Sequence, residues 1–348
     1  CRTSEDSARL CVWQTPVMYN TEKGEHKMRI GILGTGMMAN LLMPAIKKLD
    51  FDYVAVLGRR ESEEKVKALC RDNGLDAWYL DYEELLGSDV DVIYVALPND
   101  LHWEFAKKAL IWGKHVIIEK PVTACLAQLE DLAETAREQR KMIFEAMTIH
   151  YLPAYRSLRE HLAEIGDVRL MTVNYSKYSS RYDAFRAGQV LPAFDPERAG
   201  GAMMDLNVYN VHGAVGLFGK PGSVTYKANM ERGIDVSGVL TMDYGAFKVC
   251  AAAAKDSNAP ASCVIQGTEG YIRIPRPMSQ MDGYEIVNNK GEVTEYRPDS
   301  QEYRLCYEFK EFQRMIREQD RAGEQAMLDV SRMAAQVMEE ARRQVGLK

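Results

Sequence analysis

The sequence predicts an α/β domain with a doubly wound parallel sheet, followed by an α+β domain with a predominantly antiparallel, open-faced sheet. Up to residue 146, short apolar runs alternate with helical patterns, as they do in parallel sheets covered by helices on both faces. After Pro153, most of the apolar runs follow one another without helices between them, and several alternate with polar residues. At 348 residues, the chain is also long for a single core.

The first half of the chain is expected to hold six strands connected by helices. Strands are predicted where β-branched and apolar residues gather, at 29–33, 53–57, 77–79, 90–97, 115–119 and 142–146. Helical periodicity or capping predicts helices at 38–49 (with a kink at Pro44), 61–73, 82–86, 101–112 and 126–140. Residues 28–146 are therefore interpreted as the first domain. The polar, aperiodic residues 1–27 are interpreted as a flexible extension.

The second half, 147–348, reads as a sheet interrupted by one helix and closed by two. Strands are predicted at 168–176, 223–228, 236–243, 246–253, 262–266, 271–274 and 284–287. Helices are predicted at 154–164, 200–217, 301–319 and 324–345. Such a sheet needs cover for its second face, so a homodimer or homotetramer through that face is expected.

Composition is ordinary for a globular protein and favours a cytoplasmic location. The formal net charge of −6 favours neither nucleic acid nor an anionic membrane as a partner. The seven cysteines are scattered without a close pair and the six histidines are dispersed, which favours reduced thiols and gives no support for a metal site. A processed lipoprotein beginning at Cys1 is the less favoured alternative.

The turn after the first strand fits the dinucleotide-binding pattern G-x-G-x-x-A. The first glycine permits a tight turn, the second lets a pyrophosphate approach the amides at the start of the helix, and the small Ala39 allows close packing of helix and strand. The residues that would hold the cofactor here are Gly34, Thr35, Gly36, Met37 and Met38.

The end of the second strand favours NADP over NAD. NAD-binding domains usually carry an acidic residue at this tip, but here Gly58 is followed by Arg59 and Arg60. Guanidinium groups suit a 2′-phosphate because they form charge-assisted bidentate hydrogen bonds. Two alternatives stay open: the arginines simply begin a charged helix, or Glu61 reaches a ribose hydroxyl.

A lysine stands at the carboxyl end of the fifth strand. The apolar run 116–118 ends in Glu119 and Lys120, and the proline that follows biases the lysine toward an extended backbone. In open parallel sheets, ligands bind outside this edge. We therefore interpret Lys120 as a proton donor or electrostatic clamp, and a lysine that merely reaches solvent is the alternative.

The helix predicted at 200–217 carries three polar side chains on one stripe. Asp205, Tyr209 and His212 stand at i, i+4 and i+7, after two glycines that allow close backbone approach to a ligand. An aspartate and a tyrosine one turn apart, facing the lysine, would form a proton-transfer site. The alternative is that Asp205 caps the helix and Tyr209 packs. The position of His212 at the far end of this stripe favours a structural role over contact with the substrate.

These residues resemble the glucose–fructose oxidoreductase, inositol dehydrogenase and rhizopine-catabolism (Gfo/Idh/MocA) family from about residue 28 to the C-terminus. The resemblance rests on 31–36, 97–102, 113–121 and 200–209, and residues 119–121 (Glu-Lys-Pro) are its most specific element. Glu145, Ala146 and Pro153 also look like the subgroup of dimeric dihydrodiol dehydrogenase and NADP-linked xylose dehydrogenase. That subgroup commonly has arginine where His150 stands and glycine where Asn207 stands, and both positions border the expected substrate pocket.

The resemblance implies a role for each matching residue. Lys120 would contact the nicotinamide ribose and the reacting oxygen, Asp205 would orient the substrate or the lysine, and Tyr209 would transfer the proton. The residues implied to line the cofactor are Leu97, Pro98, Asn99, His102 and Glu119.

The favoured activity is hydride transfer between NADP(H) and a secondary alcohol or carbonyl of a sugar, polyol or cyclic diol. Lys120 would also favour the phenolate of Tyr209 and bring its pKa toward working pH. Two alternatives remain: a nicotinamide-nucleotide-binding sensor that does not turn over, and an NADPH reductase of a larger planar substrate, as in biliverdin reductase.

Overall fold

The computed structural model describes residues 27–298 and 302–347, and it confirms the predicted fold class. Its first sheet is parallel and has six strands in the order β3-β2-β1-β4-β5-β6. The predicted extension at 1–27 lies outside the described residues except for Lys27. The strands are β1 (Met28–Leu33), β2 (Phe51–Leu57), β3 (Ala77–Tyr79), β4 (Val92–Val95), β5 (His115–Glu119) and β6 (Ile143–Ala146).

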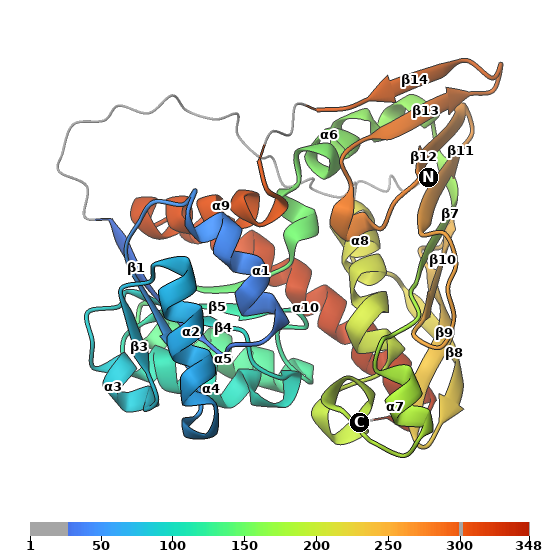
Figure 1. The fold of residues 1–348 in the computed structure, drawn as a ribbon. Helices are drawn as coiled ribbons and strands as arrows, with labels where there is room; N and C mark the ends of the chain where they lie inside the picture. The colour runs from blue at the N-terminus through green and yellow to red at the C-terminus, as the bar shows by residue number, and fades with distance from the viewer. Residues whose placement is uncertain (1–26, 299–301, 348) are drawn as a thin grey trace.

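Helices cover both faces of this sheet (Figure 1). Every residue of β4 and β5 is buried, as expected for central strands packed on both sides. The order of strands reverses between β1 and β4, so a crevice for ligands is expected beyond their carboxyl ends. The helices are α1 (Met37–Ile46), α2 (Glu63–Asn73), α3 (Tyr82–Leu86), α4 (His102–Ile111) and α5 (Leu126–Glu138).

The second sheet has eight strands in the order β14-β13-β12-β11-β7-β10-β9-β8. Neighbouring strands are antiparallel except β7 and β10, which run parallel. Strand β14 was not predicted, because its residues are exposed or only partly buried and give no alternating pattern. The strands are β7 (Val168–Ser176), β8 (Ser223–Glu231), β9 (Ile234–Asp243), β10 (Lys248–Ala254), β11 (Ser262–Gly267), β12 (Gly270–Ile274), β13 (Tyr284–Asn288) and β14 (Val293–Tyr296).

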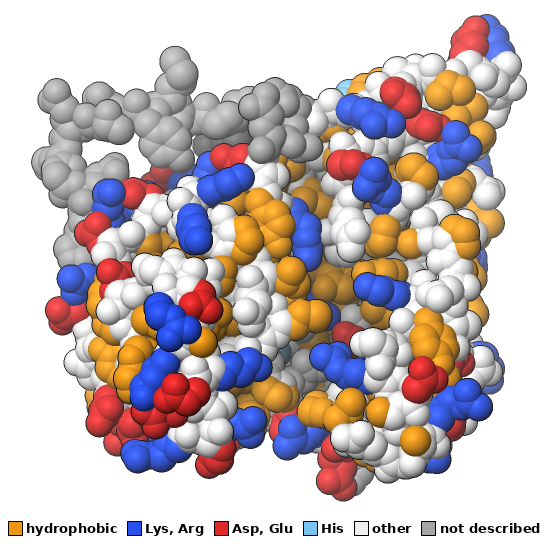
Figure 2. Space-filling view, in the orientation of Figure 1, with side chains coloured by type: hydrophobic (Ala, Val, Ile, Leu, Met, Phe, Trp, Pro, Cys, Tyr) orange, Lys and Arg blue, Asp and Glu red, His pale blue; other side chains and the backbone are white. Residues whose placement is uncertain are grey.

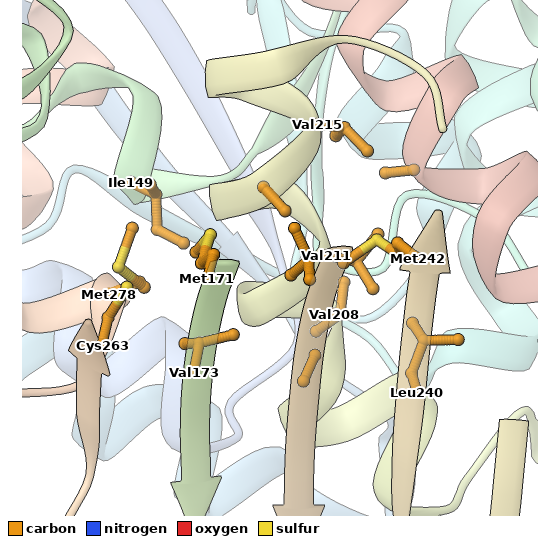
Figure 3. Close-up of a cluster of buried hydrophobic side chains, with 14 of the residues drawn as sticks. Ile149, Met171, Val173, Val208, Val211, Val215, Leu240, Met242, Cys263 and Met278 are labelled. Carbon is orange, nitrogen blue, oxygen red and sulfur yellow. The ribbon is translucent and has the colours of Figure 1, made fainter. Parts of the chain in front are cut away.

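One face of this sheet is covered by helix α8 (Val208–Phe218). Val208, Val211 and Val215 of the helix pack over Met171 and Leu240 of the strands (Figure 3). The opposite face of the sheet is exposed. On β7, Thr172 is exposed between two buried neighbours, and on β9 Val239 is 44% exposed. The sheet is therefore open-faced, as predicted.

We expected the two C-terminal helices to belong to the second unit. The structure corrects this, because both helices also pack against the first unit. Helix α9 (Arg304–Glu318) packs Phe309, Phe312 and Met315 into the core of the parallel sheet. Helix α10 (Arg321–Gln344) packs against α5 and β6 of the first unit and against α8 and β8 of the second. An amphipathic pattern shows that a helix has a buried face, but it does not identify what covers that face.

Two short helices, α6 (Pro153–His161) and α7 (Tyr182–Arg186), complete the set. In the orientation of Figure 1, apolar side chains are visible along the boundary between the two units (Figure 2). Among the described residues, no helix is long and apolar enough to cross a bilayer. The described residues also include no group of His, Cys, Asp and Glu arranged to hold a metal ion.

Candidate active site

The glycine turn after β1 has the geometry that a dinucleotide requires. Gly34 has φ +101°, and a Cβ there would lie 2.8 Å from the carbonyl oxygen of Ala96 on the neighbouring strand. A Cβ at Gly36 would meet no atom within 4 Å, so the first turn of α1 faces open space. No side chain caps that turn and no acidic residue lies in it. Its amides are therefore available to a pyrophosphate, as the motif predicts.

The tip of β2 adjoins this turn. A Cβ at Gly58 would lie 2.0 Å from the side chain of Val66 and 3.4 Å from that of Thr35, so only glycine fits there. Arg59 and Arg60 follow and are exposed. Two guanidinium groups thus stand at the place where the adenosine end of a dinucleotide would carry a 2′-phosphate.

The loop after β4 contacts the second unit. The side-chain amide of Asn99 donates to the carbonyl of Ala199 at 2.9 Å, and Arg198 lies 3.9 Å from the carboxylate of Asp100. Leu97 packs at the edge of the core beneath this loop. The predicted cofactor-lining residues Leu97, Pro98 and Asn99 therefore lie between the glycine turn and the second unit.

His102 lies beneath the site rather than in it. Its side chain is fully buried, and its ring nitrogens lie 2.9 Å from the carbonyl oxygens of Pro121 and Leu97. Burial lowers the pKa of this imidazole, so the neutral ring donates to one of the two carbonyls. Its position argues against the predicted contact with cofactor. His102 instead holds the loops after β4 and β5 together.

Lys120 follows β5 at the carboxyl edge of the parallel sheet. Its side chain is 13% exposed, and its ammonium donates to the backbone carbonyl of Asp205 at 3.2 Å. The preceding Glu119 is 5% exposed and accepts a hydrogen bond from the Tyr94 hydroxyl, and its pKa is raised by burial. The side chain of Glu119 is therefore directed into the core, which argues against its predicted contact with cofactor.

Asp205 lies in a π-helical turn, Met203–Asn207, that precedes α8. We had predicted one continuous helix over 200–217. The turn is anchored by the Met203 amide, which donates to Asp235 at 2.7 Å. A Cβ at Gly201, where φ is +102°, would lie 1.9 Å from an oxygen of the same Asp235. Glycine at 201 is thus required for this approach, and π turns are frequent at functional sites.

The structure brings Lys120, Asp205 and Tyr209 together. The Lys120 ammonium lies 3.5 Å from one carboxylate oxygen of Asp205 and 4.8 Å from the centre of the Tyr209 ring. On its other side, the Tyr209 ring packs against Tyr175 of β7, with ring centres 5.7 Å apart. The sequence-based prediction that these three residues converge agrees with this geometry.

The pKa shifts at this cluster correct the expectation that Lys120 brings the pKa of Tyr209 toward working pH. Burial raises the pKa of the Tyr209 phenol, and Lys120 lowers it by less, so the net shift is upward. Burial lowers the pKa of Lys120, but Tyr209 and Asp205 outweigh it and the net shift is again upward. Tyr209 is therefore a neutral phenol beside a charged ammonium, ready to donate a proton.

The residue that sequence reasoning missed is Lys255, the second cation on Asp205. Its ammonium lies 2.9 Å from the other carboxylate oxygen, and its side chain is 1% exposed. Burial raises the pKa of Asp205, but Lys255 and then Lys120 outweigh it and bring the pKa to about 2. Like Lys120, Lys255 immediately follows an apolar strand, and that signal was available in the sequence.

The three residues considered for substrate contact make other contacts. Asn207 and His212 lie on the π turn and α8, whereas His150 lies in the short turn Thr148–Tyr151 that precedes α6. Asn207 is fully buried, accepts from Asn210 at 2.9 Å and donates to a carbonyl of β10 at 3.4 Å. His212 is 1% exposed and lies 3.4 Å from Glu145 and 3.1 Å from His150. Burial of Asn207 and His212 argues against contact with the substrate. His150 is partly exposed but is also engaged by His212.

Comparisons with known proteins identify the family. The family model described as "Oxidoreductase family, NAD-binding Rossmann fold" (GFO_IDH_MocA) matches residues 28–147, and the GFO/IDH/MocA C-terminal domain matches residues 155–273. A scyllo-inositol 2-dehydrogenase (NADP(+)) of Bacillus subtilis is 34% identical over 325 residues, covering 92% of this chain and 98% of that protein. The chain belongs to the GFO/IDH/MocA family of oxidoreductases. The predicted family, enzyme class and nicotinamide-nucleotide cofactor are thereby confirmed.

One further relative and one solved structure are similar to this GFO/IDH/MocA protein. A trans-1,2-dihydrobenzene-1,2-diol dehydrogenase of Xenopus tropicalis is 28% identical over 333 residues, covering 91% of this chain and 98% of that protein. The solved structure of a 3-ketoreductase from Actinomadura kijaniata in complex with NADP is 20% identical, covers 91% of this chain and 97% of that chain, and has a TM-score of 0.77. The latter likeness concerns the fold alone.

The GFO/IDH/MocA chain also buries a carboxyl group on α9, close enough to Glu119 to be repelled by it. Glu308 of α9 is 1% exposed and accepts from the Thr148 hydroxyl at 3.0 Å, while its second oxygen has no partner among the described residues. Burial, and then repulsion by Glu119, raise the pKa of Glu308 well above its usual value. The folded state therefore holds a proton that the unfolded state has released near neutral pH.

In wild type, the buried Glu308 should lower the stability of the folded state as pH rises. The Glu308→Gln variant is expected to lack this pH-dependent loss. A raised pKa means that the folded protein loses stability as pH rises from about 4.3, the reference value, towards the folded-state pKa. Glutamine mimics the neutral acid, so the variant should gain on the order of 1 kcal/mol or more over wild type between pH 5 and pH 8. Thermal or urea unfolding across this range measures the difference. The exposed Glu340→Gln is the control, and parallel pH slopes for wild type and Glu308→Gln would refute the assignment.

Proposed function

We propose that this chain transfers a hydride between NADP(H) and a secondary alcohol or carbonyl of a polyol, sugar or cyclic diol. The observation that carries the proposal is the convergence of Lys120, Asp205 and Tyr209 at the carboxyl edge of the parallel sheet. The glycine turn follows β1 and Lys120 follows β5, with only β4 between these two strands. A dinucleotide lying along that edge could therefore reach all of these groups.

Each residue of the cluster has a distinct part in this reaction. The bound nicotinamide would accept or supply the hydride, while the oxygen of the substrate must lose or gain a proton. Tyr209, as a half-buried neutral phenol, donates that proton in the reducing direction and accepts it in the oxidising direction. Lys120 binds the reacting oxygen and stabilises negative charge that develops on it. Asp205 orients the lysine.

The proposed preference for NADP rests on Arg59 and Arg60. Both are exposed at the tip of β2, beside the turn that would hold the pyrophosphate. The Bacillus relative is named as NADP(+)-dependent, and a 32% identical relative over 227 residues, from Haloferax volcanii, is named D-xylose 1-dehydrogenase (NADP(+)) 2. These names support NADP and a polyhydroxylated substrate for this chain.

A substrate panel tests the proposal. The chain is incubated with NADP⁺ and, in turn, inositols, aldoses and cyclic diols, while the absorbance of the reduced nicotinamide is followed. We expect turnover with at least one compound and weaker turnover with NAD⁺. Nucleotide binding without turnover, in both the oxidising and the reducing direction, would favour the sensor. Activity only with NADPH and a planar heteroaromatic would favour a reductase of such substrates. Assembly through the open sheet face and a cytoplasmic location stay predictions.

A further inference from the structure

We infer that Lys255 is a positioning residue that pairs with Asp205, so that the charge of Lys120 remains available to the reacting oxygen. This inference rests on the proposed function and extends it to a residue outside the predicted catalytic cluster. The usual reading of a lysine at the end of a strand is solvation at the surface. Lys255 contradicts that reading, because only 1% of its side chain is exposed.

The backbone of Lys255 is held on both sides. Its amide donates to the carbonyl of Val236 at 2.8 Å, and its carbonyl accepts from the amide of Ser179 at 2.8 Å. These two bonds place the residue directly after β10, between β9 and the segment that follows β7. The side chain therefore extends from a rigid point, and its direction is set by the sheet rather than by a mobile loop.

Protein groups surround the ammonium of Lys255. It pairs with a carboxylate oxygen of Asp205 at 2.9 Å, donates a hydrogen bond to the carbonyl of Ala193, and lies 4.3 Å from the centre of the Phe194 ring. The aromatic ring adds a cation–π contact. With its directions filled in this way, Lys255 acts on the reaction through Asp205 and does not touch the substrate.

The two lysines share Asp205 unequally. Lys255 lies at 2.9 Å from its oxygen, whereas Lys120 lies at 3.5 Å from the other oxygen and is nearer to the backbone carbonyl, at 3.2 Å. Two ammonium groups and one carboxylate leave one positive charge in the cluster. With a single lysine the charges would cancel, and Lys120 would be drawn fully onto Asp205. The unbalanced charge stabilises an oxyanion on the substrate.

Asp235, the other acid near Lys255, binds other groups through one of its oxygens, and its second oxygen has no hydrogen-bond partner among the described residues. It accepts from the Met203 amide and the Tyr226 hydroxyl, both at 2.7 Å. Burial raises its pKa, and this weakens its competition for Lys255. Asp205 is therefore the carboxylate with which Lys255 forms its ion pair.

Lys255→Met tests the inference, because methionine keeps most of the length of the side chain and removes its charge. We expect kcat to fall about 10-fold or more while the affinity for NADPH is unchanged, and the apparent pKa for the proton-transferring group in the pH profile of kcat/KM to rise. Lys248→Met, at the other end of β10 and paired with Asp243 on the surface, is the matched control and should keep wild-type kinetics. Unchanged kcat and pH profile in Lys255→Met would overturn the inference.

A double variant separates positioning from simple support of the fold. If Lys255 acts through Asp205, then Lys255→Met should cost little more than a factor of 2 in an Asp205→Asn background. Equal losses in the two backgrounds would overturn the inference. Should Lys255→Met fail to fold, Lys255→Gln, which keeps a hydrogen-bond donor without the charge, takes its place in the same comparison.

A crystal structure of the variant distinguishes failure of this inference from failure of the proposed function. In Lys255→Met, we expect the Lys120 ammonium to move to within about 2.9 Å of the Asp205 carboxylate. That movement requires no turnover, so it can be observed even if the substrate panel is silent. An unmoved Lys120 would overturn the inference, whereas a silent panel with the movement present would count against the proposed function alone.

Discussion

Tyr209→Phe is expected to lower kcat by about 10² to 10⁴-fold without weakening the binding of NADPH. The substitution removes the hydroxyl that carries the proton and keeps the ring, with its neighbours Lys120 at 4.8 Å and Tyr175 at 5.7 Å. Steady-state kinetics with the best substrate of the panel, together with NADPH fluorescence titration, measures both quantities.

Lys120→Met should produce a loss of similar size, because it removes the charge that binds the reacting oxygen. The double variant with Tyr209→Phe should be little worse than either single variant, since groups that act as one unit are not additive. The control is Tyr244→Phe, which removes a hydroxyl bonded to the Gly219 carbonyl at 3.0 Å in the second unit. Wild-type turnover in both Tyr209→Phe and Lys120→Met would remove these residues from the mechanism.

The second large effect concerns the choice of cofactor. Replacing both Arg59 and Arg60 by alanine is expected to raise the Kd for NADP⁺ by about 10²-fold, since each charge-assisted hydrogen bond to phosphate contributes roughly 1.5–3 kcal/mol. The Kd for NAD⁺ should change little, because NAD⁺ has no 2′-phosphate for these side chains to bind.

Titration with both nucleotides at fixed ionic strength measures the two constants. Arg71→Ala, an exposed arginine on α2 beside Asp72, serves as the control for a general loss of positive charge. An equal loss of affinity for NAD⁺ and NADP⁺ in the Arg59 and Arg60 double variant would contradict a 2′-phosphate site. It would instead indicate that the arginines support the fold of this turn.

Local patterns in the sequence placed the glycine turn and Lys120 at the carboxyl edge of the parallel sheet, where the structure has them. The turn at Gly34 and Gly36 and the lysine after β5 are each encoded within a few consecutive residues. A short apolar run that ends in a glycine or a charged residue also identifies the carboxyl end of a strand. Because carboxyl ends of parallel strands share one edge, placing these motifs on strands was enough to bring them together.

Contacts between distant segments were less accessible. Lys255, like Lys120, immediately follows an apolar strand. The role of Lys255, however, depends on its contact with Asp205, which lies in a helical segment distant in the sequence. The i, i+4 spacing placed Asp205 and Tyr209 on one face. It could not indicate that Asn207 would contact β10 and that His212 would contact Glu145. Helical periodicity defines which residues share a face, whereas the packing partner of each face is set by tertiary structure.

The central claim is that Lys120 and Tyr209 act on the same oxygen of a substrate, and a crystal structure of a ternary complex tests it most directly. With NADP⁺ and an oxidisable polyol bound, we predict one substrate hydroxyl within about 3.5 Å of both the Lys120 ammonium and the Tyr209 hydroxyl. The carbon bearing that hydroxyl should face the nicotinamide. A bound polyol whose oxygens contact neither group, or contact only one of them, would contradict the mechanism.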